Sequence, residues 1–167
     1  MTIGFKVYST IPMHTQLFRA LIRQAPRHCG DALESSYIRD SIRDPSHRVY
    51  VMYDKKKLIS GKFRYSILGF ATAKESPRDI YIDVICSKSR KGAFILNSII
   101  HHRKPLRLGS VVDRKTLGWY NRAGFVPAGL VENGLIPFHR SPGGKLRPRS
   151  GLRSWKPKIK RPYTLRK

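Results

Sequence analysis

The sequence predicts an α/β fold, in which a mixed central sheet is flanked by helices and followed by an extended basic tail. The first observation is the order of apolar patterns, which indicates a strand, two helices, three strands, a helix, a strand, a helix and a strand. The second is a change at residue 139, after which prolines, glycines and cations alternate and apolar side chains are isolated. We therefore expect one domain over residues 1–138 and a tail over residues 139–167 that only a partner orders.

The first half of the chain supplies the antiparallel part of the predicted sheet. Its predicted elements are a strand at residues 3–9, a helix carrying Leu17, Leu21 and Ile22, a loop at residues 26–30, a helix from Asp31 to Arg43, and strands at residues 47–54, 65–74 and 79–87. The last of these strands is apolar on both faces, which is typical of a strand at the centre of a sheet.

The second half predicts a βαβ crossover. A helix is predicted from Gly92 to Ile100, and a strand beginning at Leu106 follows it. A short helix then ends at Gly124, because glycine suits the left-handed position after a helix, and Phe125 begins the next strand. Asn133-Gly134 predicts a tight turn in a last hairpin.

The formal net charge of +24 is large and unevenly distributed. Residues 139–167 carry 11 Lys or Arg and no Asp or Glu, which leaves +13 (24 minus 11) for residues 1–138. Such a field attracts nucleic acid, anionic membranes or acidic protein surfaces. A phosphate-bearing cofactor needs only a few of these charges, so enzymatic activity alone does not explain them.

The two cysteines indicate no disulfide framework, and metal-ligand spacing is absent. Cys86 lies in an apolar run and is expected to be a buried free thiol, which favours a reducing compartment, the cytoplasm or nucleus. The first residues lack the pattern of a signal peptide. No apolar stretch approaches the roughly 20 residues of a membrane span, so none is expected.

Residues 106–125 carry the most informative motif. In the predicted helix, Asp113, Thr116 and Tyr120 share one face, and Gly124-Phe125 follow at its end. This pattern resembles the C-terminal signature of the GNAT superfamily of N-acetyltransferases, and the order of elements agrees with the GNAT topology. The resemblance implies that Tyr120 lies beside the sulfur of acetyl-CoA and protonates the leaving thiolate. The alternative for Tyr120 is a core aromatic beside Trp119.

The resemblance extends to the strand and loop that bind acetyl-CoA in this family. There, the fourth strand binds the pantetheine arm, and a glycine-containing loop opens a helix whose N–H groups bind the pyrophosphate. The matching residues here are Val84, Cys86, Lys88, Arg90, Lys91, Gly92 and Ala93. Two positions depart from the family pattern: Ser89 replaces Arg or Gln, and Phe94 replaces Gly or Ala. A ring at position 94 is expected to obstruct the pyrophosphate, unless Ala93 takes the role of the small residue.

A general base would have to face the region where the fourth and fifth strands diverge. Asp83 is the only carboxylate within the fourth strand, where alternation gives it the same face as Tyr81 and Ile85. It is therefore the candidate base, with a satisfied structural acid as the alternative. Glu34 is a more distant candidate.

The tail combines cations with aromatic side chains, which suits a phosphate backbone and stacking on unpaired bases. The predicted polyanion-binding residues are Arg147, Arg149, Arg153, Trp155, Lys156, Lys158, Lys160 and Arg161. The alternatives are an acidic protein surface within a large assembly and a solvated tail without a partner. The run Ile82–Cys86 also resembles acetyltransferase-like proteins of large DNA viruses.

Two functions are compatible with these observations. The first is an acetyl-CoA-dependent N-acetyltransferase whose tail binds a polyanion. The second is a catalytically inactive protein of the same fold that serves as a structural component of a virion or nucleoprotein assembly, anchored by its tail. Ser89, Phe94 and the charge favour the second, whereas Tyr120 and Gly124-Phe125 are consistent with the first.

Overall fold

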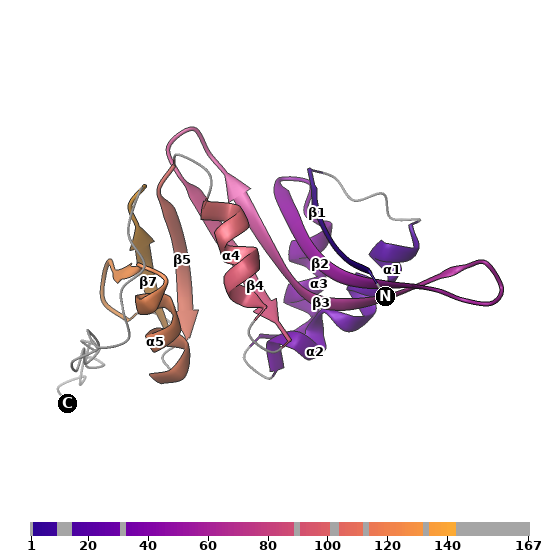
Figure 1. The fold of residues 1–167 in the computed structure, drawn as a ribbon. Coiled ribbons are helices and arrows are strands. Elements are labelled where there is room, and N and C mark those ends of the chain that lie inside the picture. Colours follow the sequence, from indigo (N-terminus) through magenta and orange to yellow (C-terminus); the bar gives the residue numbers. More distant parts are fainter. Residues whose placement is uncertain are drawn as a thin grey trace, which may run out of the picture.

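A computed structural model of the chain describes residues 2–9, 15–30, 33–88, 91–100, 104–111, 114–131 and 134–142. Within them, a seven-stranded sheet has the order β1-β2-β3-β4-β5-β7-β6 (Figure 1). Its strands are β1 (Thr2–Tyr8), β2 (His47–Lys57), β3 (Phe63–Glu75), β4 (Ile80–Ser87), β5 (Leu106–Val111), β6 (Val126–Pro127) and β7 (Leu135–Arg140). The β4–β5 pair is parallel and the others are antiparallel. The predicted central position of β4 is confirmed.

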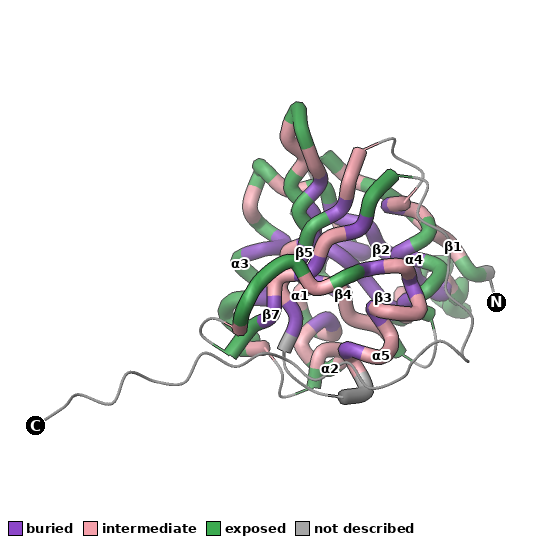
Figure 2. Tube along the Cα trace, turned by 90° about the vertical axis from the view of Figure 1, so that its left-hand side faces the viewer, coloured by how far each residue is buried: buried purple, intermediate pink, exposed green. Residues whose placement is uncertain are grey.

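Helices cover both faces of the sheet (Figure 1). They are α1 (Gln16–Gln24), α2 (Pro26–Cys29), α3 (Ser35–Arg43), α4 (Gly92–Ile100) and α5 (Arg114–Arg122). The apolar side chains of α1 and α3 form one core with β2, β3 and Val84 of β4, and those of α4 and α5 form another core on the opposite face. Buried residues accordingly run through the middle of the molecule, as Figure 2 shows. None of the helices in the described ranges is long and apolar enough to cross a membrane.

The N-terminal helices differ from the prediction in two places. The segment expected to be a loop contains the short helix α2, which Pro26 can begin because the first turn of a helix needs no N–H from that residue. The third helix begins at Ser35 rather than Asp31, with Glu34 as its N-cap residue. The first helix begins after Thr15, whose side chain accepts a hydrogen bond from the amide of Phe18 at 3.1 Å.

A disulfide joins Cys29 of α2 to Cys86 of β4, with 5.0 Å between the Cα atoms. The prediction of a free thiol at Cys86 was therefore wrong. The apolar setting of Cys86 was read correctly, since it packs against the α1–α3 core, but Cys29 is part of the same cluster. Only the tertiary fold brings these positions together, and the prediction of a reducing compartment loses its support.

The hairpin between β2 and β3 projects beyond the rest of the sheet (Figure 1). The partners of β3 explain why: β2 pairs with it as far as Phe63, whereas β4 ends opposite Gly69. We call residues 55–64 the ribbon. Its two strands are supported mainly by each other and by Thr2 of β1, which pairs with Lys55.

The C-terminal part of the domain follows the predicted turns. Gly124 has a φ of 86° and ends α5 in the left-handed region, so that prediction is confirmed. Gly134 has a φ of 74° before β7, whereas Asn133, the other residue of the predicted turn, lies outside the described residues. The strand expected after Phe125 is the short β6, and β7 lies between β5 and β6. Residues 139 and 140 belong to β7, whereas the predicted polyanion-binding residues at 147–161 lie outside the described residues.

Candidate active site

The strands β4 and β5 pair over three residues only and then diverge. Ile80, Tyr81 and Ile82 pair with residues 106–108, whereas β4 continues to Ser87 and β5 to Val111. The β5-facing edge of β4 from residue 83 to residue 87 thus has no strand partner among the described residues. This edge presents main-chain N–H and C=O groups to a ligand lying between the two strands.

A β-bulge begins this divergence. Thr72 of β3 pairs with Val84 and Ala73 pairs with Ile82, so Asp83 is an extra residue without a β3 partner. The alternation of side chains changes there: Ile82 packs in the α4–α5 core and Val84 in the α1–α3 core. The prediction that Asp83 shares a face with Ile85 was therefore wrong. Asp83 points toward α3, and Ile85 packs on the opposite face.

The carboxylate of Asp83 is held by side chains from two other elements, α3 and β2. The hydroxyls of Tyr37 and Ser41, both on α3, donate to its two oxygens, and Nε2 of His47 lies 3.7 Å from Oδ2. Ser41 also contacts the Thr72 hydroxyl at 2.6 Å, and since the Ser41 proton points to Asp83, Thr72 is the donor. The side chain of Asp83 is 15% exposed, so solvent or a substrate can still reach it.

Tyr37 falls within the helix expected from Asp31 to Arg43, but no role was predicted for its side chain, which is 45% exposed. Burial of its hydroxyl end, and then the hydrogen bond to Asp83, raise the pKa of Tyr37, so the phenol keeps its proton at neutral pH. The sequence around Tyr37 does not indicate that its hydroxyl binds a carboxylate, because Asp83 is 46 residues away. His47 and Ser41 were missed for the same reason.

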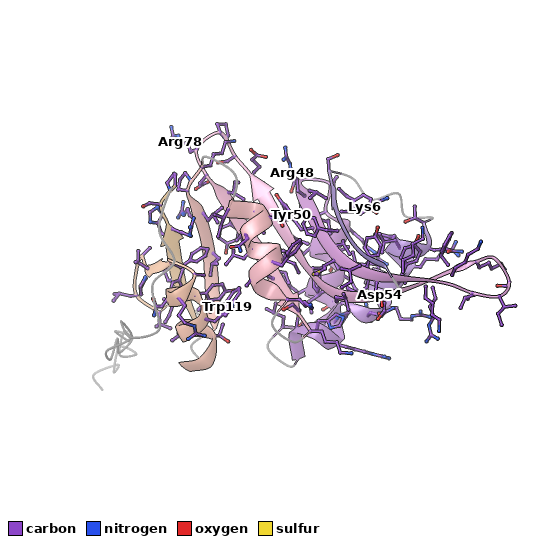
Figure 3. All side chains as sticks on the ribbon, in the orientation of Figure 1. Lys6, Arg48, Tyr50, Asp54, Arg78 and Trp119 are labelled. Carbon is purple, nitrogen blue, oxygen red and sulfur yellow. A yellow bond between two sulfur atoms is a disulfide. The ribbon has the colours of Figure 1, made fainter. Side chains whose placement is uncertain are left out.

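Gly92 begins α4 directly after the loop that follows β4. A Cβ atom at this position would lie 3.0 Å from Oγ of Ser87 and 3.4 Å from the Trp119 ring, which explains the absence of a side chain. Figure 3 shows Trp119 on the side of α5 that faces α4. The first N–H groups of a helix lack partners within it, so the start of α4 can bind an anion.

Phe94 was the main objection to a phosphate site at this helix. Its ring packs edge-on against Phe5 of β1, with 5.4 Å between the centroids, and is half exposed. The ring therefore leans toward β1, whereas the nearest atoms around Gly92 belong to Ser87 and Trp119. Lys88 and Lys91 are exposed beside the loop, and Ala93 is exposed in the first turn; Ser89 and Arg90 lie outside the described residues.

Tyr120 is buried in the α4–α5 core. Its ring contacts those of Trp119, Phe125 and Phe138 at centroid distances of 4.8, 5.6 and 5.8 Å. Burial raises the pKa of Tyr120, which keeps its hydroxyl protonated. Its cluster includes the last paired residues of β4 and β5, so Tyr120 lies in the core from which the two strands diverge.

The remaining predicted residues fall into three groups. Val84 and Cys86 have side chains that face the α1–α3 core, so only their main chain is available on the open edge of β4. Glu34 is exposed at the start of α3 and accepts a hydrogen bond from Ser36, apart from the Asp83 cluster. Asp113 lies outside the described residues.

The sequence matches no family model and no curated protein. Solved structures do match: ElaA from Escherichia coli superposes with a TM-score of 0.58 at 13% identity, covering 84% of this chain and 100% of that one. The ribosomal-protein-S18-alanine N-acetyltransferase from Escherichia coli gives 0.57 at 10%, covering 84% and 94%. The PaiA N-acetyltransferase from Thermoplasma acidophilum, solved with coenzyme A, gives 0.54 at 13%, covering 84% and 99%.

The fold is that of the GNAT N-acetyltransferases. Identities near 10% establish the fold alone. In this fold, the open edge of β4 against β5, the Asp83 bulge and the start of α4 at Gly92 follow one another along the chain. They form the candidate active site.

Proposed function

We propose that this protein is an acyl-CoA-dependent N-acyltransferase, with acetyl-CoA as the donor. The observation that carries the proposal is the divergence of β4 from β5 after Ile82, together with the start of α4 at Gly92. An open strand edge and a helix N-terminus are the two features that a pantetheine arm and a pyrophosphate require. A structure of the same fold was solved with coenzyme A, which supports this class of ligand.

Each part of the donor has candidate partners in this chain. Main-chain groups of Val84 and Cys86 would bind the pantetheine arm, because their strand edge is open on the β5 side. The N–H groups of Gly92 and Ala93 would bind the pyrophosphate, and Lys91, together with Arg90, would supply positive charge. The thioester would supply the activated acyl group that an amine accepts.

Two side chains are suited to moving the protons of the transfer. Asp83 would accept the proton that the amine loses, either directly or through the hydroxyl of Tyr37, which is both exposed and bonded to it. Tyr120 would donate a proton to the thiolate; burial raises its pKa, so the hydroxyl carries that proton at neutral pH. The acceptor would approach from the α3 side, where Tyr37 lies.

The second candidate is an inactive protein of this fold that serves as a structural component of a virion or nucleoprotein assembly. The observation that favours it is the packing of Tyr120, whose three ring contacts give it a structural role without catalysis. The basic tail would then anchor the protein to nucleic acid or to an acidic protein surface.

Calorimetric titration of the full chain with acetyl-CoA separates these candidates. Because a net charge of +24 attracts any polyanion, the control ligand is 3′-phosphoadenosine diphosphate, which has the phosphates of the donor but lacks its pantetheine arm. We expect acetyl-CoA to bind at least about tenfold more tightly, since the β4 edge pairs only with the arm. Equal affinity for both ligands would overturn the proposal.

A pair of variants locates the site. Lys91→Glu changes a charge beside the start of α4, whereas Lys74→Glu changes an exposed lysine of β3 by the same amount. We expect Lys91→Glu to weaken acetyl-CoA binding at least about tenfold and Lys74→Glu to change it less than about threefold. Similar losses in both variants would mean that the cofactor responds to total charge and not to this loop.

A further inference from the structure

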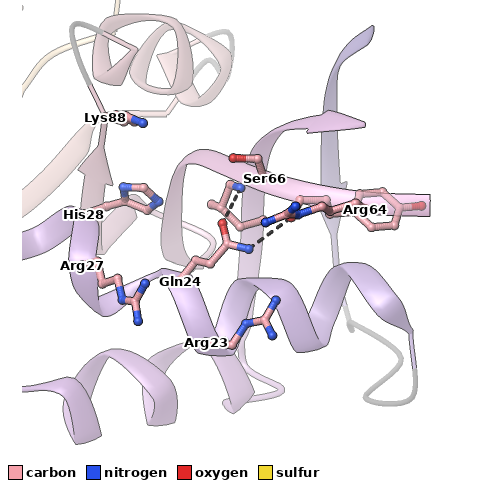
Figure 4. Close-up of a pocket in the computed structure, with 9 residues that line it drawn as sticks. Arg23, Gln24, Arg27, His28, Arg64, Ser66 and Lys88 are labelled. Atoms are coloured by element: carbon pink, nitrogen blue, oxygen red, sulfur yellow. Dashed lines mark hydrogen bonds between the residues drawn. The ribbon is translucent and has the colours of Figure 1, made fainter. Parts of the chain in front are cut away.

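A strongly basic pocket lies on the α1–α2 face of the sheet, apart from the open edge between β4 and β5. Its cavity has a volume of about 680 Å³, and Arg23, Arg27, Arg64 and Lys88 supply cations to its lining (Figure 4). Among the residues that the structure describes, no Asp or Glu lines this cavity. We call these four cations and their cavity the basic pocket. Its volume lies within the ~300–1,000 Å³ typical of ligand sites.

The cations of the basic pocket are not neutralised by the described part of the chain. The ion pairs found there involve His47, Arg48, Lys104 and Arg107, none of which lines the basic pocket. His28 also lines it, and its Nε2 is buried without a hydrogen-bond partner among the described residues. Four uncompensated cations leave the site suited to an anion.

The basic pocket exists because β3 extends past the end of β4. The Gln24 side chain occupies the strand edge that β4 leaves open: its amide donates to the Tyr65 carbonyl at 3.1 Å, and its oxygen accepts from the Ile67 amide at 2.9 Å (Figure 4). The disulfide fixes α2, which carries Arg27 and His28, to β4. The walls are therefore held in place before any ligand binds.

The ribbon extends the positive charge of the basic pocket. It carries Lys55, Lys56, Lys57, Lys62 and Arg64 and no Asp or Glu, and Arg64 belongs to both structures. Arg64 pairs across the strands with Lys56, and the ammonium of Lys55 lies 3.7 Å from the centroid of the Phe63 ring. At the tip, Ile59 is fully exposed, with Leu58 and Phe63 also exposed.

We propose that the basic pocket and the ribbon bind a nucleic-acid duplex through its phosphates. A small nucleotide would need only the basic pocket, whereas a row of cations continuing along a projecting hairpin matches the repeating charge of a backbone. A two-stranded ribbon also fits the major groove of B-DNA, which is about 12 Å wide. The contacts are mainly between cations and phosphates, so the binding is tolerant of sequence.

The test compares two full-length variants that lose the same charge. The surface variant carries Arg23→Gln, Arg27→Gln, Lys56→Gln and Arg64→Gln; the matched control carries Arg39→Gln, Arg43→Gln, Lys74→Gln and Arg78→Gln, all exposed positions away from the basic pocket and the ribbon. Fluorescence anisotropy measures the affinity for a labelled duplex of about 20 base pairs between about 50 and 200 mM salt. The tail is present in both variants, so its contribution cancels.

We expect the surface variant to bind at least about 30-fold more weakly, and the slope of log K against log salt to fall by about 3 to 4, near 0.9 for each lost phosphate contact. The control should change affinity less than about threefold. Equal losses in both variants, or no loss in the surface variant, would overturn the proposal.

Two further measurements keep the result clear. If the surface variant does not fold, judged by circular dichroism, the double variant Lys56→Gln and Arg64→Gln replaces it, because both side chains are exposed on the ribbon. Tighter binding of a single strand than of the duplex would overturn the assignment of the ligand. Full displacement of the duplex by micromolar ATP would also overturn it and would identify a small nucleotide as the ligand.

Discussion

The hydroxyl of Tyr37 donates a hydrogen bond to the carboxylate of Asp83, and this bond joins α3 to the point at which β4 leaves β5. Ser41, one helical turn after Tyr37, holds the other carboxylate oxygen. Two hydroxyl donors from one helix thus fix the orientation of the Asp83 carboxylate. One of them, the protonated phenol of Tyr37, is exposed at the surface. This arrangement gives Asp83 a defined position in the proposed reaction.

We expect Asp83→Asn to lower kcat for acyl transfer by at least about 10²-fold, because the amide cannot accept a proton. Tyr37→Phe should lower kcat less, since the carboxylate remains. Steady-state kinetics with an amine acceptor measures both. The free energy of unfolding serves as the control. If the carboxylate had only a structural role, Asp83→Asn would lower the free energy of unfolding and leave kcat of the folded enzyme unchanged.

Tyr120→Phe should separate the two roles of this side chain. The phenylalanine ring preserves the contacts with Trp119, Phe125 and Phe138, so the free energy of unfolding should change by less than about 1 kcal/mol. If the hydroxyl protonates the thiolate, kcat should fall by about 10²-fold while the Kd of acetyl-CoA stays the same. An unchanged kcat would assign Tyr120 to the core alone.

The disulfide closes a loop with a sequence separation of 57 residues. Loop-closure entropy for this length predicts a stabilisation of about 4 kcal/mol, chiefly through the unfolded state. Replacing both Cys29 and Cys86 with serine should therefore lower the free energy of unfolding by about 2 to 4 kcal/mol, measured in urea. If the oxidised protein and the double variant have the same urea midpoint, the bond does not form in solution.

Stability should also depend on the protonation of His28. Burial, followed by the nearby charge of Lys88, lowers the pKa of His28. The unfolded state then binds the proton more readily than the folded state, so stability is retained above pH ~6.5 and lost as pH falls toward the lowered folded pKa. Urea midpoints from about pH 7.5 to 5 should decline less in His28→Gln, and parallel curves for both proteins would contradict this.

Apolar patterns carried enough information to predict most of the elements. Strand β4 reads as central because it is apolar on both faces, and Gly124 and Gly134 have the positive φ angles that only glycine adopts at little cost. These features depend on residues close together in the sequence. Tyr120, singled out by its spacing from Gly124, indeed lies at the core where β4 and β5 meet.

The features that were not predicted depend on residues far apart in the sequence or on one extra residue in a strand. The alternation of β4 contains no mark of the bulge at Asp83, because the partner strand decides which residue is unpaired. Tyr37 and Asp83 are 46 residues apart, and Cys29 and Cys86 are 57 apart. The ribbon was not predicted, because residues 55–64 lie between the strands expected at 47–54 and 65–74, and the three lysines were predicted to form a turn. In the structure β2 continues to Lys57 and β3 begins at Phe63, and the projection of the ribbon depends on where β4 ends.

The disulfide gives the two proposed anion sites a common covalent anchor. Cys29 adjoins His28 at the wall of the basic pocket, and Cys86 precedes the loop that leads to α4. A single bond thus connects the wall of the basic pocket, on one face of the sheet, to the segment that leads to α4 on the other face. In a reducing medium both sites would lose that anchor at once, so the redox history of a preparation bears on its affinity for nucleic acid and for acyl-CoA alike.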